Sequence, residues 1–280
     1  MISSFGGADP RRIATFTVCA GAFVLLAGCA ASTAGTSGPA TPQNARQAIT
    51  VASDDTQRAD SMAGTFSMRL GNGTGETTAG TIQVQRVPSL VFDENLSISA
   101  DGHTLPVTEI MSTNAIYLKE AGLSHETGKP WLEVPFSGLD GNLGSALAQM
   151  FQSAQNGNPL EQVQMLAASK NVRAVGTQVI DGVQTTDYTG SFTSSAAVSA
   201  LSSSVRQSVR PMLSVLSGDI RFNAWIDAQH QVRSLTETET VSGEPVYVTI
   251  NVTAINQPVH ISVPAASQVV TLPRSGASGM

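Results

Sequence analysis

Histidine is a common catalytic acid or base and a common metal ligand, and this chain has four of them. His103, His125, His230 and His260 are scattered along the sequence, and three of them lie in or beside predicted turns. None has a metal-ligating residue two or four positions further on, as zinc sites require. We therefore predict that each histidine is a surface residue and that the chain has no metal site.

Carboxylates offer a second kind of chemistry, because paired acidic groups can bind a cation or exchange protons. Asp93 and Glu94 are adjacent in a predicted loop, and Glu237 and Glu239 share one face of a predicted strand. We predict that both pairs are solvated surface groups. Asp227 is predicted to form a turn.

Serine is abundant, but no serine has the sequence context of a nucleophile. Neither a Gly-x-Ser-x-Gly elbow nor a Ser-x-x-Lys sequence with its supporting motifs occurs. The glycine-rich residues 71–75 lead into a strand and not into a helix, so they do not form a phosphate loop. The sequence predicts a protein that is not an enzyme and needs no cofactor.

The two cysteines lie close to the N-terminus. Cys19 is inside an apolar run that follows Arg11 and Arg12, and Cys29 ends the sequence Leu-Ala-Gly-Cys at residues 26–29. A positive start, an apolar core and small residues describe an export signal. With Cys29 placed directly after it, this stretch resembles the lipobox of bacterial lipoproteins. The resemblance implies cleavage before Cys29 and a diacylglyceryl cysteine that anchors the chain to the extracytoplasmic side of the cell membrane.

The alternative is an uncleaved membrane-spanning helix. The apolar run from Ile13 to Ala27 has 15 residues, which is short for a span of roughly 20. We therefore expect a lipoprotein signal peptide over residues 1–28 and a flexible tether over 29–42. Residues 43–272 would form one domain, and residues 273–280 a disordered tail.

Charge and cysteine content limit the partners of the mature chain. The formal charge of the whole sequence is −6. Loss of Asp9, Arg11 and Arg12 leaves 20 acidic and 13 basic side chains, a charge of −7. An acidic domain gains little from counterion release, so nucleic acid is excluded as a partner. With Cys29 acylated, no thiol remains for a disulfide, a zinc site or a nucleophile.

The pattern of apolar residues predicts an α+β domain built on one large antiparallel sheet. Helical periodicity occurs over about 43–58, 141–170 and 194–216. Alternation with period two predicts about ten strands, most of them joined by hairpins. An antiparallel sheet typically has one solvent-exposed face and one apolar face. We therefore expect a curved sheet with helices on its concave, apolar face. The alternating segments are 65–70, 81–85, 96–98, 103–110, 116–119, 131–134, 172–180, 183–192, 220–227, 232–241, 246–252 and 260–263.

Several short motifs stand in a recognisable order along the domain. They are the helix 43–58 before the Phe66, Met68 and Leu70 strand, Lys129-Pro130-Trp131, Asp181-Gly182-Val183, and Trp225-Ile226-Asp227 before Val232-Arg233. Together with the lipobox, they resemble the LppX/LprG-type lipoproteins of actinobacteria, whose fold is similar to that of the carriers LolA and LolB. The resemblance implies a strongly curved half-barrel closed by helices over a hydrophobic cavity. It also implies a lipid or lipoglycan ligand carried or presented across the cell envelope, and an envelope transporter as a partner.

The predicted ligand site is the apolar lining of that cavity. A second interpretation is that the same side chains pack against one another and leave no void. On the same fold, the chain would then be a non-catalytic sensor or scaffold lipoprotein that binds a protein partner. The predicted lining residues are Phe66, Met68, Leu70, Ile82, Val84, Ile98, Met150, Phe151, Ile220, Phe222, Val248 and Ile250.

Overall fold

The fold is known from a computed structural model of the whole chain. It describes residues 42–57, 59–71, 75–100, 102–120, 122–139, 169–193, 216–241 and 243–271, with the isolated positions 144, 145, 148, 195, 196 and 199. Cys29, the signal peptide, residues 29–41 of the tether and the tail lie outside these residues, as do Met150 and Phe151.

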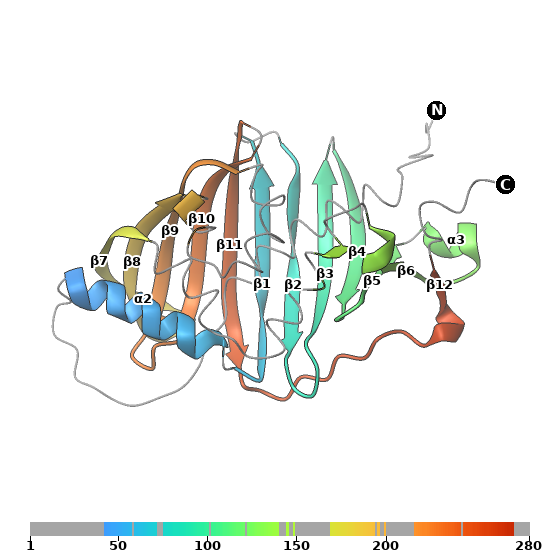
Figure 1. Cartoon of the computed structure of the whole chain (residues 1–280), viewed down its shortest axis with the longest axis horizontal. Helices are drawn as coiled ribbons and strands as arrows, with labels where there is room; N and C mark the ends of the chain where they lie inside the picture. Colours follow the sequence, from blue (N-terminus) through green and yellow to red (C-terminus); the bar gives the residue numbers. More distant parts are fainter. Residues whose placement is uncertain are drawn as a thin grey trace.

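The described part of the chain is mostly β and forms one 12-stranded sheet (Figure 1). The strand order is β12-β6-β5-β4-β3-β2-β1-β11-β10-β9-β8-β7, and every pair except β12 with β6 is antiparallel. The strands are β1 (Ser61–Leu70), β2 (Thr77–Gln85), β3 (Val91–Ala100), β4 (His103–Met111), β5 (Ala115–Glu120), β6 (Trp131–Pro135), β7 (Lys170–Ile180), β8 (Val183–Thr193), β9 (Leu216–Asp227), β10 (Val232–Val241), β11 (Glu244–Ile255) and β12 (Val269–Thr271).

Two hairpins show why the alternating segments pair as predicted. Asp181 and Gly182 both have positive φ, at 47° and 80°, which is the geometry of the tight turns that join two twisted strands. They join β7 to β8, with Ile180 opposite Val183. Gly102, with φ of 77°, lies in the turn between β3 and β4, where Ala100 is opposite His103.

The predicted short strand at residues 260–263 is wrong. This segment crosses the face of the sheet that carries Val91 and Ile110, and Ile261 packs against both. The Ile261 N–H donates to the side-chain oxygen of Gln85 at 2.9 Å instead of joining a strand. The last strand is β12, further along the chain, which pairs in parallel with β6 through Val269 opposite Trp131.

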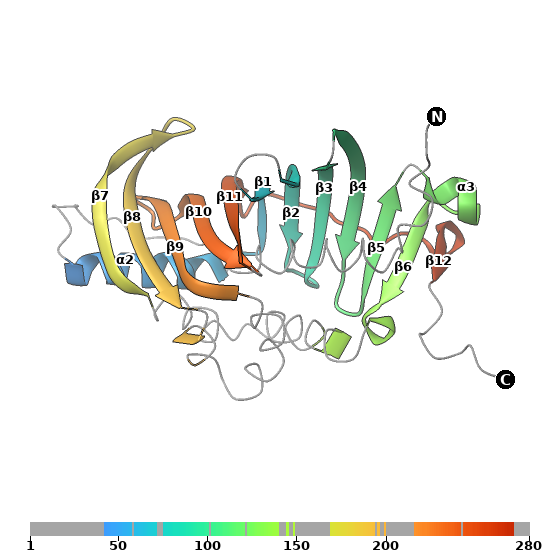
Figure 2. The same ribbon diagram turned by 90° about the horizontal axis from the view of Figure 1, so that it is seen from above.

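The sheet is open and is not strongly curled, which differs from the predicted half-barrel. β12 and β7 form its two edges and do not meet. Seen from above, β7 and β8 are bowed, whereas β5 and β6 run nearly straight (Figure 2). The alternation of residues sets which face of a strand is buried, but it does not set how far a sheet bends.

The helix predicted over 43–58 is confirmed as α2 (Pro42–Gln57). Ala45, Ile49 and Ala52 form its buried stripe and join the main hydrophobic core. Arg46 Nη2 donates to the carbonyl of Ser169 at 2.6 Å, just before β7, and α2 crosses the sheet near that edge (Figure 1). A second short helix is α3 (Leu123–Thr127), and two 3-10 turns are Phe136–Gly138 and Ala266–Gln268.

The two longer helical segments predicted over 141–170 and 194–216 fall largely outside the described residues. No helix in the described part of the chain is long and apolar enough to cross a membrane.

Candidate functional site on the inner face

All of the predicted lining residues that the structure describes lie on one face of the sheet. Phe66 is opposite Ile250, and Met68 is opposite Val248. Residues directly opposite in an antiparallel pair point to the same side, so the register extends this face across the sheet. We call it the inner face, because it carries the main hydrophobic core and α2. It includes Phe66, Met68, Leu70, Ile82, Val84, Ile98, Ile220, Phe222, Val248 and Ile250.

Burial changes along the inner face from one end of the strands to the other. Met62, Phe92 and Met111 are 6% exposed or less at the end where β1 begins. At the other end, where the β1 arrow ends in Figure 1, apolar side chains pack on the core but are only half-buried. We call these the rim residues: Met68, Leu70, Ile98, Leu105 and Val241.

Four buried glutamates also lie on the inner face, and this corrects the prediction that Glu94, Glu237 and Glu239 are solvated; the fourth is Glu109. Glu94 belongs to β3 and not to a loop, and it lies directly opposite Glu109. Glu237 and Glu239 lie on β10, opposite Val248 and Val246. The sequence did contain a signal for this. Each glutamate keeps the phase of apolar neighbours two positions away, for example Glu94 between Phe92 and Leu96.

Glu94 and Glu109 form a buried pair of acids. Burial raises the pKa of Glu94 to about 7, and the neighbouring Asp93 carboxylate adds to the rise. Burial raises the pKa of Glu109 well above its usual range, and the charge of Glu94 contributes. Glu94 Oε1 and both carboxyl oxygens of Glu109 are buried without a hydrogen-bond partner among the described residues. Because like charges directly opposite are destabilising, the pair favours protonated forms.

Glu237 and Glu239 form the second acidic pair, close to the rim residues. Burial raises the pKa of Glu237 to about 7. Burial raises the pKa of Glu239 to about 8, and the nearby Glu237 charge adds to this effect. Both carboxyl oxygens of Glu239 are buried, and no described residue forms a hydrogen bond with them.

Asp227 is confirmed as a turn-forming residue. Its Oδ1 accepts hydrogen bonds from the backbone N–H groups of Gln229 and Gln231, both at 2.9 Å. Its Oδ2 is 2.7 Å from Arg233 Nη2 in an ion pair. These contacts hold the β9–β10 turn closed.

The histidines lie at the surface or in a turn, as predicted. His103, His125 and His260 are exposed, and His230 is in the β9–β10 turn with φ of 58°. Within the described ranges, no three His, Cys, Asp or Glu residues are grouped so that they could hold a metal ion.

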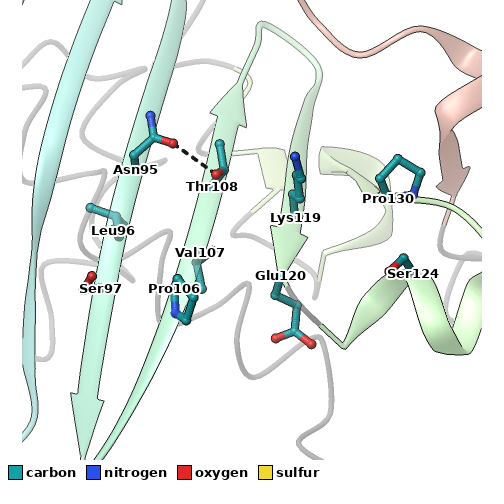
Figure 3. Close-up of a pocket in the computed structure, with 10 residues that line it drawn as sticks. All are labelled: Asn95, Leu96, Ser97, Pro106, Val107, Thr108, Lys119, Glu120, Ser124 and Pro130. Atoms are coloured by element: carbon teal, nitrogen blue, oxygen red, sulfur yellow. Dashed lines mark hydrogen bonds between the residues drawn. The ribbon is translucent and has the colours of Figure 1, made fainter.

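A separate open groove of about 450 Å³ lies over β3, β4 and β5 (Figure 3). Asn95, Thr108 and Lys119 are opposite one another in register, on the face away from Leu96. Thr108 Oγ1 donates to Asn95 Oδ1 at 3.1 Å. The sequence analysis did not select this groove, which mixes polar and apolar residues and lies mostly on the outer face. Its lining residues are Asn95, Leu96, Ser97, Pro106, Val107, Thr108, Lys119, Glu120, Ser124 and Pro130.

The comparison with solved structures finds proteins of similar fold. The chain is similar in structure to two mycobacterial lipoproteins. LprF from Mycobacterium bovis has 14% sequence identity and a TM-score of 0.47, with 82% of this chain and 100% of that chain covered. LppX from Mycobacterium tuberculosis has 18% identity and a TM-score of 0.48, with 79% and 100% covered.

A lipoprotein-sorting domain gives a weaker structural match. This outer membrane protein domain from Vibrio parahaemolyticus has 10% identity and a TM-score of 0.27, with 75% of this chain and 88% of that chain covered. No protein-family model matches the sequence, and no curated protein matches it. The structural resemblance expected from the sequence motifs is thus found, at low sequence identity.

Proposed function

We propose that this protein is a non-catalytic envelope lipoprotein that binds lipid against the inner face of its sheet and carries or presents it across the cell envelope. The observation that carries the proposal is the row of half-buried rim residues, which continues directly into the buried core of the same face. Apolar side chains that line a concave or sheltered site are typical of sites for apolar ligands.

The energetics favour an acyl chain as the occupant. Transfer of a methylene group from water to an apolar site yields roughly 0.8 kcal/mol. Leu70, Ile98 and Leu105 leave apolar surface accessible at the rim, so a chain that covers them removes both its own surface and theirs from water. The outer groove around Asn95, Thr108 and Lys119 presents polar groups and offers less of this gain.

The anchor completes the proposal. A diacylglyceryl group on Cys29 would hold the chain at the membrane, and residues 30–42 would act as the tether. A flexible chain of about 13 residues has a root-mean-square reach on the order of 20 Å. The domain would therefore stay near the bilayer that supplies or receives its lipid, while remaining free to turn its rim toward it.

The test of this function compares a rim variant with a matched variant at two exposed valines outside the strands of the sheet. Replacing Leu70 and Ile98 by glutamine is expected to weaken the binding of a fluorescent long-chain alcohol at least about tenfold, because the bound chain loses apolar contacts there. The control replaces Val87 and Val263, which are 58% and 46% exposed and lie outside the strands, by glutamine. It should bind as the natural chain does.

Titration of fluorescence gives the dissociation constant, and circular dichroism checks that both variants remain folded. Unchanged binding in the rim variant, or an equal loss in the control, would contradict a lipid site on the inner face.

A further inference from the structure

Glu237 and Glu239 lie where the head group of a bound amphiphile would come to rest. In register, Glu239 is opposite Val246, which is opposite the rim residue Leu70. Glu237 is opposite Val248, which is opposite the rim residue Met68. The two glutamates are two residues apart on one strand, a spacing of about 7 Å, so one compact group can reach both.

Glu239 is buried and has no hydrogen-bond partner among the residues that the structure describes. Its side chain is 2% exposed, and both carboxyl oxygens lack a partner within that part of the chain. A buried polar group without a partner costs about 1–3 kcal/mol, and a charged one costs more. A ligand that donates hydrogen bonds to this carboxyl would remove that cost.

The charged side chains of the inner face determine whether a positive or a negative head group is favoured. On the described strands, Arg69, Lys119, Arg173 and Arg221 are paired in register with outer-face residues. Arg233 is paired with Asp227 at the β9–β10 turn.

The buried glutamates of these strands are distributed differently. Glu94, Glu109, Glu237 and Glu239 all lie on the inner face. In the described strands, this face therefore buries four glutamates and no lysine, arginine or histidine. A phosphate or carboxylate head group would be repelled there, whereas a cation would be attracted.

We propose that the Glu237–Glu239 pair binds the cationic amine head group of an amphiphile whose chain lies along the inner face beside Met68 and Phe66. The inference rests on the proposed function and names the class of ligand. An ammonium group supplies up to three N–H donors and a positive charge, and charge-assisted hydrogen bonds are roughly twice as strong as neutral ones. The raised pKa values of both acids agree with a site that lacks its counterion.

Three probes with the same 12-carbon chain test the inference: dodecylamine, dodecanol and dodecanoate. With the full chain, dodecylamine is expected to bind at least about tenfold more tightly than either of the others, as expected for one charge-assisted contact. Glu239→Gln should reduce dodecylamine binding to the level of dodecanol. Asp219→Asn removes one charge from an exposed outer-face position of β9 and should leave the preference intact.

Isothermal titration below the micelle concentration of each probe measures the three affinities. Equal binding of dodecylamine and dodecanol, or an amine preference that survives Glu239→Gln, would overturn this inference while leaving lipid binding in place. Failure of all three probes to bind would overturn the proposed function as well.

Discussion

Replacing Glu94 and Glu109 together by glutamine is expected to stabilise the protein strongly at alkaline pH and hardly at all at acid pH. Both carboxyls are buried against the core, and three of their four oxygens have no hydrogen-bond partner in the part of the chain that the structure describes. The neutral acid resembles glutamine in size and polarity, whereas the ionised acid must hold a charge without water. The difference in stability between the natural chain and the double variant therefore grows as pH rises.

The sign follows from proton linkage. Burial raises the folded-state pKa of Glu94 from 4.5 to about 7 and holds that of Glu109 well above its usual range. Between pH 4.5 and those raised values, the folded chain holds protons that the unfolded chain releases, so the free energy of unfolding falls with increasing pH. The contribution of the neutral acids is complete below pH 4.5 and is lost as pH rises through the folded pKa values.

The expected size of the stabilisation follows from the pKa shift of Glu94. One pKa unit corresponds to about 1.4 kcal/mol, so Glu94 alone accounts for on the order of 3 kcal/mol. Urea denaturation of the natural chain and of the double variant should give similar free energies of unfolding at pH 4.5. At pH 9 the variant should be more stable by several kcal/mol. A difference that does not change with pH would contradict the burial of these acids in the folded chain.

The second large effect is expected at the N-terminus. Cys29→Ala removes the proposed acylation site, so metabolic labelling with a clickable palmitate analogue should no longer mark the protein. Cys19→Ala is the matched control, because Cys19 lies within the apolar run of the proposed signal and should leave labelling unchanged. Gel fluorescence of the immunoprecipitated chain measures the label.

Membrane fractionation adds a second readout for the same two variants. If the Cys29→Ala chain is still cleaved, it should leave the membrane fraction while keeping its thermal unfolding midpoint. The apparent mass on the gel reports cleavage. Persistent labelling of the Cys29→Ala chain would contradict acylation at this residue.

Strand alternation and tight-turn sequences were the reliable predictors of the fold. Alternation placed β1, β2 and β11 correctly and assigned Phe66, Ile82 and Ile250 to one face, because side-chain direction in a strand is fixed by the backbone. The positive-φ turn at Asp181 and Gly182 was predictable for a similar reason, since few residues tolerate that conformation.

The exposure of the acidic residues was predicted wrongly, because the prediction relied on their chemical type. Glu94 and Glu237 were expected in solvent because carboxylates are usually exposed. Their positions in the alternation of each strand place them on the inner face. These positions predicted burial better than the residue type did. Residues 260–263 misled the prediction in the opposite way: Ile261 is apolar and lies between polar neighbours, but its N–H bonds to Gln85 instead of to a strand. Sheet curvature was not predictable, because it depends on packing between distant segments.

The inner face therefore combines two properties that have opposite energetic effects. Apolar residues such as Phe66 and Val248 stabilise the fold, while buried acids such as Glu109 and Glu239 destabilise it. A stretch of apolar surface beside unpartnered carboxyls is expected where a ligand supplies both the missing contacts and the missing hydrogen bonds. Natural proteins retain such local conflicts mostly at functional sites.

The central claim is that lipid binds on the inner face, and photo-crosslinking tests it most directly. A long-chain alcohol with a diazirine near its chain end is bound to the full-length protein and irradiated, and the labelled positions are located by peptide mass spectrometry at single-residue resolution. We predict labels at inner-face positions of β1 and β11, such as Met68 and Val248. Labels confined to outer-face positions such as Asn95, Thr108 and Lys119, or no specific labelling, would contradict the account.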